Sequence, residues 1–123
     1  MNQSSNNKPV YDLEERTFLF AKNIRTSLRK LKKDSFNQDD IKQLIRSSGS
    51  VGANYIEANE SLSKKDFIHR VKISRKEAKE SIYWIRLLIA FSNTDEKNSL
   101  EVLLQKSTEL KKILSSIIEK SQK

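Results

Sequence analysis

The chain has 123 residues, of which 36% are hydrophobic and 33% are charged, and it contains no cysteine. This length predicts one domain with a single core, and the lack of cysteine excludes disulfides and thiolate metal sites and fits a cytoplasmic protein. There are 24 Lys and Arg residues against 16 Asp and Glu residues, a formal net charge of +8. This balance favours anionic partners such as nucleic acid or an acidic protein, although a lysine-rich solvated surface would produce it as well.

Residues 1–10, MNQSSNNKPV, are polar and contain no apolar run. We therefore expect a flexible tail there, with neither a signal peptide nor a membrane anchor. From residue 11 to residue 121 the chain has almost no breakers, and its apolar residues recur at helical spacing. Four amphipathic helices are predicted, over about 12–33, 37–62, 64–92 and 95–121.

The first predicted helix has Asp12 as its N-cap, with Glu15 three residues later. The second follows a break and starts at Asn37. Ser63 with Asp66, and Asn93 with Glu96, are the expected starts of the third and fourth helices. The four predicted core stripes comprise Leu13, Thr17, Phe20, Ile24, Leu28 and Leu31; Ile41, Leu44, Ile45, Ser48, Val51, Gly52, Tyr55, Ile56, Asn59 and Leu62; Phe67, Val71, Ser74, Ala78, Ile82, Ile85 and Ile89; and Leu100, Leu103, Leu104, Ser107, Leu110, Leu114, Ile117 and Ile118. Four such helices joined by short loops predict an all-α, antiparallel, up-down-up-down four-helix bundle.

The second predicted helix contains both glycines of the chain, in the stretch RSSGSVGANYIEANE. Each glycine costs a helix about 1 kcal/mol relative to alanine, so a packing or functional reason is expected. Opposite the core stripe lie Arg46, Ser50, Ala53 and Glu57, with Gly49 at the edge. This narrow back predicts close contact with a second copy of the chain, with the two charged residues at its rim. A solvated polar back is the alternative.

A second apolar patch lies on the third predicted helix, about half a turn from its core stripe. The patch comprises Ile73, Trp84, Leu87 and Phe91. Two apolar faces on one helix predict burial on both sides, either inside the bundle or against a neighbouring subunit. Aromatic residues favour the subunit interface.

Basic residues are concentrated on two helix faces. The first face lies on the back of helix one, with Phe18 on the same arc, and carries Lys22, Arg25, Arg29, Lys32 and Lys33. The second lies on helix three, with His69 and Tyr83 beside it, and carries Lys65, Lys72, Lys76 and Lys79. Basic stripes that include an aromatic residue are typical of surfaces that follow phosphates and stack bases, whereas an ordinary solvated face is the alternative.

The groups required for catalysis are sparse. His69 is the only histidine, and no serine or cysteine motif near it indicates a nucleophile. Asp66 and His69 have the spacing of half a di-metal carboxylate site, but the second histidine of such a site is missing. We therefore expect no enzyme activity, no metal and no cofactor. A hydrolase or nuclease that uses His69 is a distant third alternative.

The stretch RSSGSVGANYIEA resembles the signature of the 23S rRNA intervening-sequence protein family, whose members are four-helix bundles. The recurrent positions of that signature fall on Arg46, Ser50, Ala53, Asn54 and Glu57. The stretch FIHRVKISRKEAKESIYWIRLL is similar to the third helix of the family, at Phe67, Ile73, Arg75, Glu80 and Leu88. Gly52, Tyr55 and Ala58 depart from the signature, while Tyr83 and Trp84 fit one branch of the family.

This resemblance implies a bundle that assembles into a ring-like homo-oligomer, typically a homopentamer, with no established catalytic activity. It also implies that Arg46, Ser50, Ala53, Asn54, Glu57, Arg75, Glu80 and Trp84 form the oligomer interface or the family motif. The accessory protein of diversity-generating retroelements is related to this family, and it binds nucleic acid and a reverse transcriptase.

Our leading hypothesis is a non-enzymatic, homo-oligomeric bundle, without a membrane partner, that binds structured RNA or DNA through phosphate contacts. The residues expected to make these contacts are Lys22, Arg25, Arg29, Lys32, Lys33, Lys72, Lys76 and Lys79. The alternative is a protein-interaction scaffold whose basic ring docks an acidic partner or a nucleic-acid enzyme.

Overall fold

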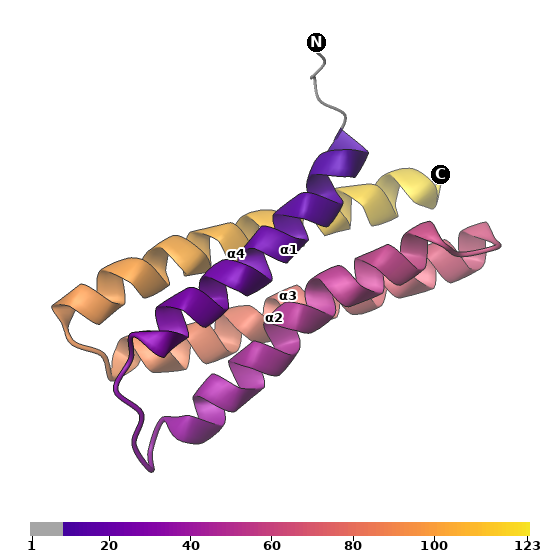
Figure 1. The fold of residues 1–123 in the computed structure, drawn as a ribbon. Coiled ribbons are helices and arrows are strands. Elements are labelled where there is room, and N and C mark those ends of the chain that lie inside the picture. Colours follow the sequence, from indigo (N-terminus) through magenta and orange to yellow (C-terminus); the bar gives the residue numbers. More distant parts are fainter. Residues whose placement is uncertain (1–8) are drawn as a thin grey trace, which may run out of the picture.

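The computed structural model describes residues 9–123. They form α1 (Pro9–Arg29), α2 (Gln38–Asn59), α3 (Lys64–Ala90) and α4 (Thr94–Ser121), and this described part of the chain contains no strand. Successive helices run in opposite directions (Figure 1), so the prediction of an all-α, up-down-up-down bundle is confirmed.

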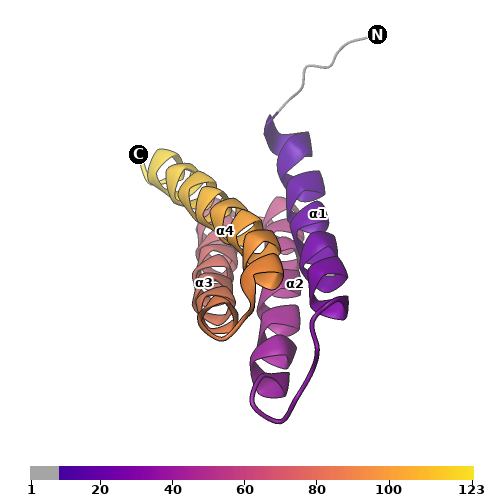
Figure 2. The same cartoon turned by 90° about the vertical axis from the view of Figure 1, so that its left-hand side faces the viewer.

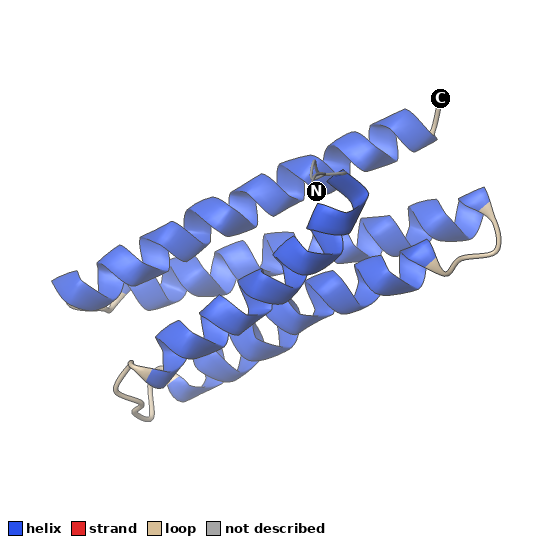
Figure 3. Ribbon diagram, turned by 45° about the horizontal axis from the view of Figure 1, so that its top comes forward, coloured by secondary structure: helices blue, strands red, loops and turns tan. Residues whose placement is uncertain are grey.

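Each helix contacts two others. Both α1 and α3 pack against α2 and α4, so α1 and α3 are diagonal to each other. Figure 2 shows α4 tilted away from α1 toward the C-terminus. Arg16 and Glu109 join these two helices in an ion pair of 3.0 Å. The α1–α2 and α3–α4 loops lie at one end of the bundle, and the α2–α3 loop lies at the other (Figure 3).

The first helix begins and ends earlier than predicted. It starts at Pro9, so Asp12 is not its N-cap. Proline is favoured in the first helical turn because its missing N–H has no helical partner there. Residues 1–8 of the expected tail lie outside the described residues, and Pro9 and Val10 belong to α1.

Hydrogen bonds in the α1–α2 loop explain why α1 ends at Arg29. The Asp34 carboxylate accepts from the backbone N–H of Phe36 at 2.8 Å and of Asn37 at 2.9 Å, and the Asn37 side chain donates to the Lys32 carbonyl at 3.0 Å. These bonds fold residues 32–37 into a compact turn. The predicted extension of the helix to residue 33 was therefore wrong.

The expected N-caps of α3 and α4 are confirmed. Ser63 Oγ accepts from the Asp66 N–H at 3.1 Å, and Asn93 forms a reciprocal capping box with Glu96. The C-terminal end of α2 differs from the prediction, because the helix ends at Asn59 and Leu62 in the following loop is 99% exposed. Leu62 is therefore not part of the core stripe.

The core lies between the four helices and is mostly aliphatic. It comprises Leu13, Phe20, Ile24, Leu28, Ile41, Leu44, Val51, Tyr55, Ala58, Val71, Ala78, Ile85, Leu88, Leu100, Leu103, Leu110, Leu114 and Ile118. Buried serines allow the helices to approach closely, and two of them donate to a neighbouring helix backbone. Ser74 donates to the Val51 carbonyl at 2.6 Å, and Ser107 donates to the Ala78 carbonyl at 3.0 Å. These bonds join α3 to α2 and α4 to α3.

Candidate functional site

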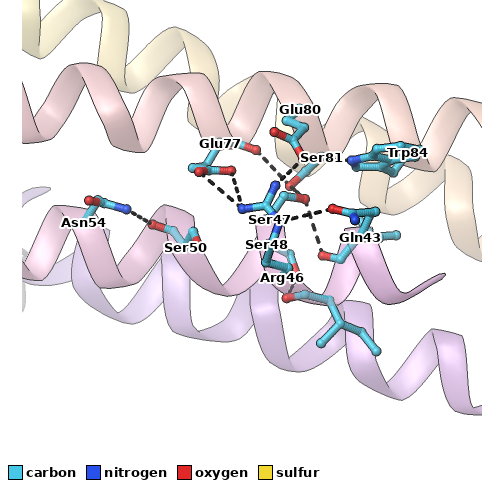
Figure 4. Close-up of polar contacts among 12 residues, drawn as sticks. Gln43, Arg46, Ser47, Ser48, Ser50, Asn54, Glu77, Glu80, Ser81 and Trp84 are labelled. Atoms are coloured by element: carbon cyan, nitrogen blue, oxygen red, sulfur yellow. Dashed lines mark hydrogen bonds and ion pairs between the residues drawn. The ribbon is translucent and has the colours of Figure 1, made fainter. Parts of the chain in front are cut away.

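A polar network joins the outer sides of α2 and α3 (Figure 4). The Arg46 guanidinium donates to both carboxylate oxygens of Glu77, at 3.3 and 3.4 Å, and to Glu80. Trp84 Nε1 donates to Glu80 at 3.0 Å, and Arg46 Nε donates to Gln43 at 3.2 Å. Three predicted motif residues, Arg46, Glu80 and Trp84, therefore meet in one cluster within a single chain.

The charges of this network stabilise each other. The pKa of Glu80 is lowered, chiefly by the hydrogen bond from Trp84 and further by Arg46 and Lys76, against the opposing effect of partial burial. The pKa of Arg46 is raised, chiefly by its hydrogen bond to Glu80. The network therefore joins α2 to α3 by charge-assisted hydrogen bonds, and we call it the α2–α3 clamp. Arg46 was expected at the rim of a subunit contact, but its acidic partners belong to its own chain.

The other predicted residues on the side of α2 opposite the core make fewer contacts within the chain. Asn54 Nδ2 donates to the Ser50 carbonyl at 2.9 Å, one turn earlier in α2. Ala53 and Glu57 are exposed and Ser50 is half-buried. This part of α2 is open to a partner.

The two glycines of α2 are explained by contacts with α1. A Cβ atom at Gly52 would lie 2.9 Å from Thr17 Oγ1, and a Cβ atom at Gly49 would lie 3.1 Å from Arg25 Nη2. The first distance is too short for any real Cβ contact, so Gly52 permits a close helix crossing. Gly49 leaves room for the Arg25 side chain within the same chain.

The predicted basic stripe on α1 is not continuous. Arg25 is half-buried and donates to the backbone carbonyls of Ala21 at 3.0 Å and of Ile45 at 3.1 Å. Lys32 and Lys33 lie in the loop and not on the helix. Of the five predicted phosphate contacts on this stripe, Lys22 and Arg29 remain as exposed residues of the helix itself.

The basic face of α3 is intact. Lys72, Lys76 and Lys79 are all exposed, and they lie on the side of α3 that faces away from the core. At the N-terminal end of this face, Lys65 and His69 line a shallow hollow of about 470 Å³, to which Lys64, Ile68, Lys72, Ser121 and Gln122 also contribute. His69 is an exposed residue of this basic surface.

Arg75 does not join the motif cluster. It donates to Ser115 Oγ of α4 at 3.4 Å, and it therefore lies on the opposite flank of α3. In the apolar patch, Ile73, Trp84 and Leu87 are half-buried and Phe91 is 88% exposed. The patch therefore lies outside the core.

The loop end of the bundle contains an apolar hollow of about 600 Å³. Leu31, Leu87 and Phe91 line it, together with Phe36, which is 91% exposed. Asp34, Asp40 and Glu96 are the acidic residues of its lining, and Lys32 is the basic one. The sequence did not indicate this hollow, because it is formed by two loops together with the ends of the helices that they join.

The sequence analysis missed two residues of the network, the acceptor Gln43 and the buried acid Glu77. Glu77 is the more informative of the two. Only 8% of it is exposed, although it is charged, because its carboxylate lies against Arg46. Its position three residues before Glu80 was the available signal, since residues at this spacing share a helix face. Its partner on α2 was not visible in the sequence.

Two further observations concern the described residues alone. Between residues 9 and 123, no group of three or more His, Cys, Asp or Glu side chains is arranged to hold a metal ion. No helix in this range has a stretch long and apolar enough to span a membrane.

The fold and these surfaces define an antiparallel four-helix bundle with a charged α2–α3 clamp and a basic outer face on α3. Residues 11–116 match the family model described as 23S rRNA-intervening sequence protein, and the chain belongs to this family. The motif residues Arg46, Glu80 and Trp84 lie within the matched range.

A solved structure supports this assignment. The chain is similar to a protein of unknown function from the S23 ribosomal protein family of Bacteroides thetaiotaomicron VPI-5482, solved by crystallography at 1.70 Å. The two share 33% identity over 86% of this chain and 97% of the other, with a TM-score of 0.72. No curated protein matches the chain.

Proposed function

We propose that this protein is a non-enzymatic, cytoplasmic, homo-oligomeric helical bundle that binds RNA or DNA through phosphate contacts with its basic surface. The observation that supports this proposal is the separation of charge on α3. Lys72, Lys76 and Lys79 are exposed on its outer side, while Glu77 and Glu80 are bound to Arg46. Exposed cations whose neighbouring acids are bound mainly by another residue are suited to the phosphates of a nucleic acid.

Assembly into a ring would strengthen this binding, because symmetry repeats the basic face around the oligomer. The proposed contact uses the small-residue side of α2 and the flank of α3 nearest to α2, at Trp84 and Phe91, and it leaves the face with Lys72, Lys76 and Lys79 free. Ala53 is exposed there, Trp84 is half-buried, and Phe91 is almost fully exposed. A homopentamer is the stoichiometry that the family resemblance favours. The accessory protein of diversity-generating retroelements, which also binds nucleic acid, supports the proposal by analogy.

A titration with labelled RNA and DNA, followed by fluorescence anisotropy at several salt concentrations, tests the proposal. We expect the logarithm of affinity to fall linearly with the logarithm of salt concentration. A variant with Lys72→Glu, Lys76→Glu and Lys79→Glu is expected to lose most of its affinity. The matched control carries Lys42→Glu, Lys106→Glu and Lys120→Glu, which change the net charge equally on α2 and α4. Absence of binding by the wild type at low salt would reject the proposal.

The second candidate is a protein-interaction scaffold that docks an acidic protein or a nucleic-acid enzyme. The observation in its favour is the apolar hollow at the loop end, with Phe36 and Phe91 exposed beside it. Because the charged residues of its lining are mostly acidic, an acidic partner would meet the basic face of α3 and place only an apolar side chain in the hollow. Exposed aromatic residues of this kind are common at protein interfaces. This candidate predicts capture of one defined protein in a pull-down, and loss of that capture in Phe36→Ala or Phe91→Ala, with weak nucleic-acid binding throughout.

A further inference from the structure

The exposed side of α3 contains one unbroken line of cationic and aromatic residues. Along this line the spacing alternates between four and three residues, which keeps the side chains on one side of a helix. All of its members are exposed and none is acidic. We call this line the α3 track; it comprises Lys65, His69, Lys72, Lys76, Lys79, Tyr83 and Arg86. At 1.5 Å per residue it is roughly 30 Å long.

Two of the three acidic residues of α3, Glu77 and Glu80, bind Arg46 on its α2 side. Between Lys72 and Arg86, α3 contains only Glu77 and Glu80 as acidic residues. Glu77 is buried against Arg46, and Glu80 accepts from both Arg46 and Trp84. The track therefore offers a row of mostly Lys and Arg side chains about 5 Å apart along the helix axis, with Glu77 and Glu80 engaged on the α2 side and the exposed Asp66 beside its N-terminal end.

Tyr83 is the aromatic member of the track. It is 55% exposed, and its ring meets the Trp84 ring edge to face, with 5.0 Å between centroids and 74° between planes. Trp84 is itself fixed by its hydrogen bond to Glu80. Tyr83 is thus a supported and accessible ring between Lys79 and Arg86, where a base can stack on it.

The exposed ring of Tyr83 favours a single strand over a duplex as the ligand. Because α2 and α4 cover two sides of α3, only its outer side is open. The major groove of B-DNA admits a helix, whereas that of A-form RNA does not, and double-stranded RNA is bound mainly at its phosphates and 2′-hydroxyl groups. A base can reach the ring of Tyr83 only when it is unpaired, since paired bases are stacked within the helix.

We propose that the α3 track binds a single-stranded segment of nucleic acid, with its phosphates along the cations and a base stacked on Tyr83. This inference rests on the proposed function and specifies its ligand. It also assigns Lys65, His69, Tyr83 and Arg86 to the binding surface and removes the α1 stripe from it.

The test compares three fluorescent probes of about 16 nucleotides at one salt concentration: oligo-U RNA, oligo-dT DNA and a fully paired duplex. We expect the two single strands to bind at least tenfold more tightly than the duplex. Tyr83→Ala is expected to weaken single-strand binding about tenfold and to leave duplex binding unchanged, while Tyr83→Phe retains it. In a separate titration of oligo-U at several salt concentrations, Arg86→Gln is expected to reduce the slope of log affinity against log salt by about one.

Phe18→Ala is the matched control, because Phe18 is 60% exposed on α1, on the arc of the stripe that the proposal removes. Its single-strand affinity is expected to be unchanged. Equal affinity for the duplex and the single strands would overturn this inference and leave the proposed function intact. A loss of affinity in Phe18→Ala but not in Tyr83→Ala would overturn the assignment to α3. If none of the probes binds, the proposed function and this inference both fail.

Discussion

At Gly52 the backbone of α2 lies directly against the side chain of Thr17 on α1. Thr17 is only 1% exposed and donates to the Glu14 carbonyl at 2.9 Å, so its position is fixed. At Gly49 the neighbouring atom is the far end of the Arg25 side chain, which is flexible. The two glycines therefore have different structural roles, although they are three residues apart in one helix.

We predict that Gly52→Ala destabilises the protein and that Gly49→Ala does not. Alanine gains about 1 kcal/mol in helix propensity at either position, but overpacking against Thr17 costs about 1–3 kcal/mol. Urea denaturation of both variants at equal protein concentration measures the difference, and we expect Gly49→Ala to be the more stable by at least about 1 kcal/mol. Equal stabilisation by both substitutions would contradict the close crossing.

A second residue-scale prediction concerns the acid sensitivity of the α2–α3 clamp. The pKa of Glu80 is lower in the folded protein than its ordinary value. The stability that this carboxylate contributes is therefore complete above its unfolded pKa, about 4.3, and is lost as the pH falls through its folded pKa. We expect Glu80→Gln to cost about 1 kcal/mol at pH 7 and progressively less below about pH 4.

Thermal or urea unfolding as a function of pH checks this prediction. Glu101→Gln is the control, because Glu101 is an exposed carboxylate on α4. We expect the control to follow the wild-type profile. If Glu80→Gln lowers the free energy of unfolding by the same amount at neutral and acidic pH, the charge of Glu80 does not contribute to stability, which would contradict the prediction.

At the scale of the helices, two buried serine hydroxyls hold α3 against α2 and α4, because each donates to the backbone of a neighbouring helix. Ser74→Ala and Ser107→Ala should each cost about 1 kcal/mol, because each loses one buried hydrogen bond. The two bonds involve different helix pairs. The costs should therefore add in the double variant.

Urea denaturation of the single and double variants measures these costs, with Ser116→Ala on the exposed side of α4 as the control. Circular dichroism should show unchanged helix content in all of them. A double variant no less stable than the single variants would indicate that the hydroxyls do not hold the helices together.

The helices and two of their caps could be predicted from the sequence, because helical periodicity and capping are local properties. Ser63 and Asn93 show this, since each accepts from a backbone N–H only three residues away. The compact turn after α1 could not be predicted, because it depends on how Asp34 and Asn37 share their hydrogen bonds. This turn ends α1 at Arg29 and places Lys32 and Lys33 in the loop, so the basic stripe that was predicted to be continuous on the first helix is interrupted.

The sequence predicted several residues of the candidate site, but it did not predict which of them contact each other. The motif residues Arg46, Glu80 and Trp84 were singled out, yet their contact depends on how α2 and α3 rotate against each other. That rotation is set by packing across the core and leaves no local signal in either helix. The prediction that Arg25 is a free phosphate contact fails for the same reason, since its acceptor, the Ile45 carbonyl, lies on another helix.

At the scale of the whole molecule, we predict a particle whose mass is a multiple of 14.3 kDa. Ala53 is exposed in the single chain, so a larger side chain there should not disturb the fold of the bundle itself. We expect Ala53→Trp to reduce the mass measured by light scattering at micromolar concentration while circular dichroism stays unchanged, because a bulky ring blocks close approach of a second copy.

Val102→Trp is the control, because Val102 is 59% exposed on α4, away from the proposed contact. Its mass should equal that of the wild type. A wild-type mass of one chain, unaffected by either substitution, would contradict the assembly.

The hydroxyl groups of Ser74 and Ser107 bond to peptide carbonyls, which every sequence possesses, rather than to particular side chains. These two bonds hold α3 against its neighbours without any contribution from the side chains of the α3 track. Substitutions along that track can therefore alter the preference for a ligand while the architecture of the bundle stays the same.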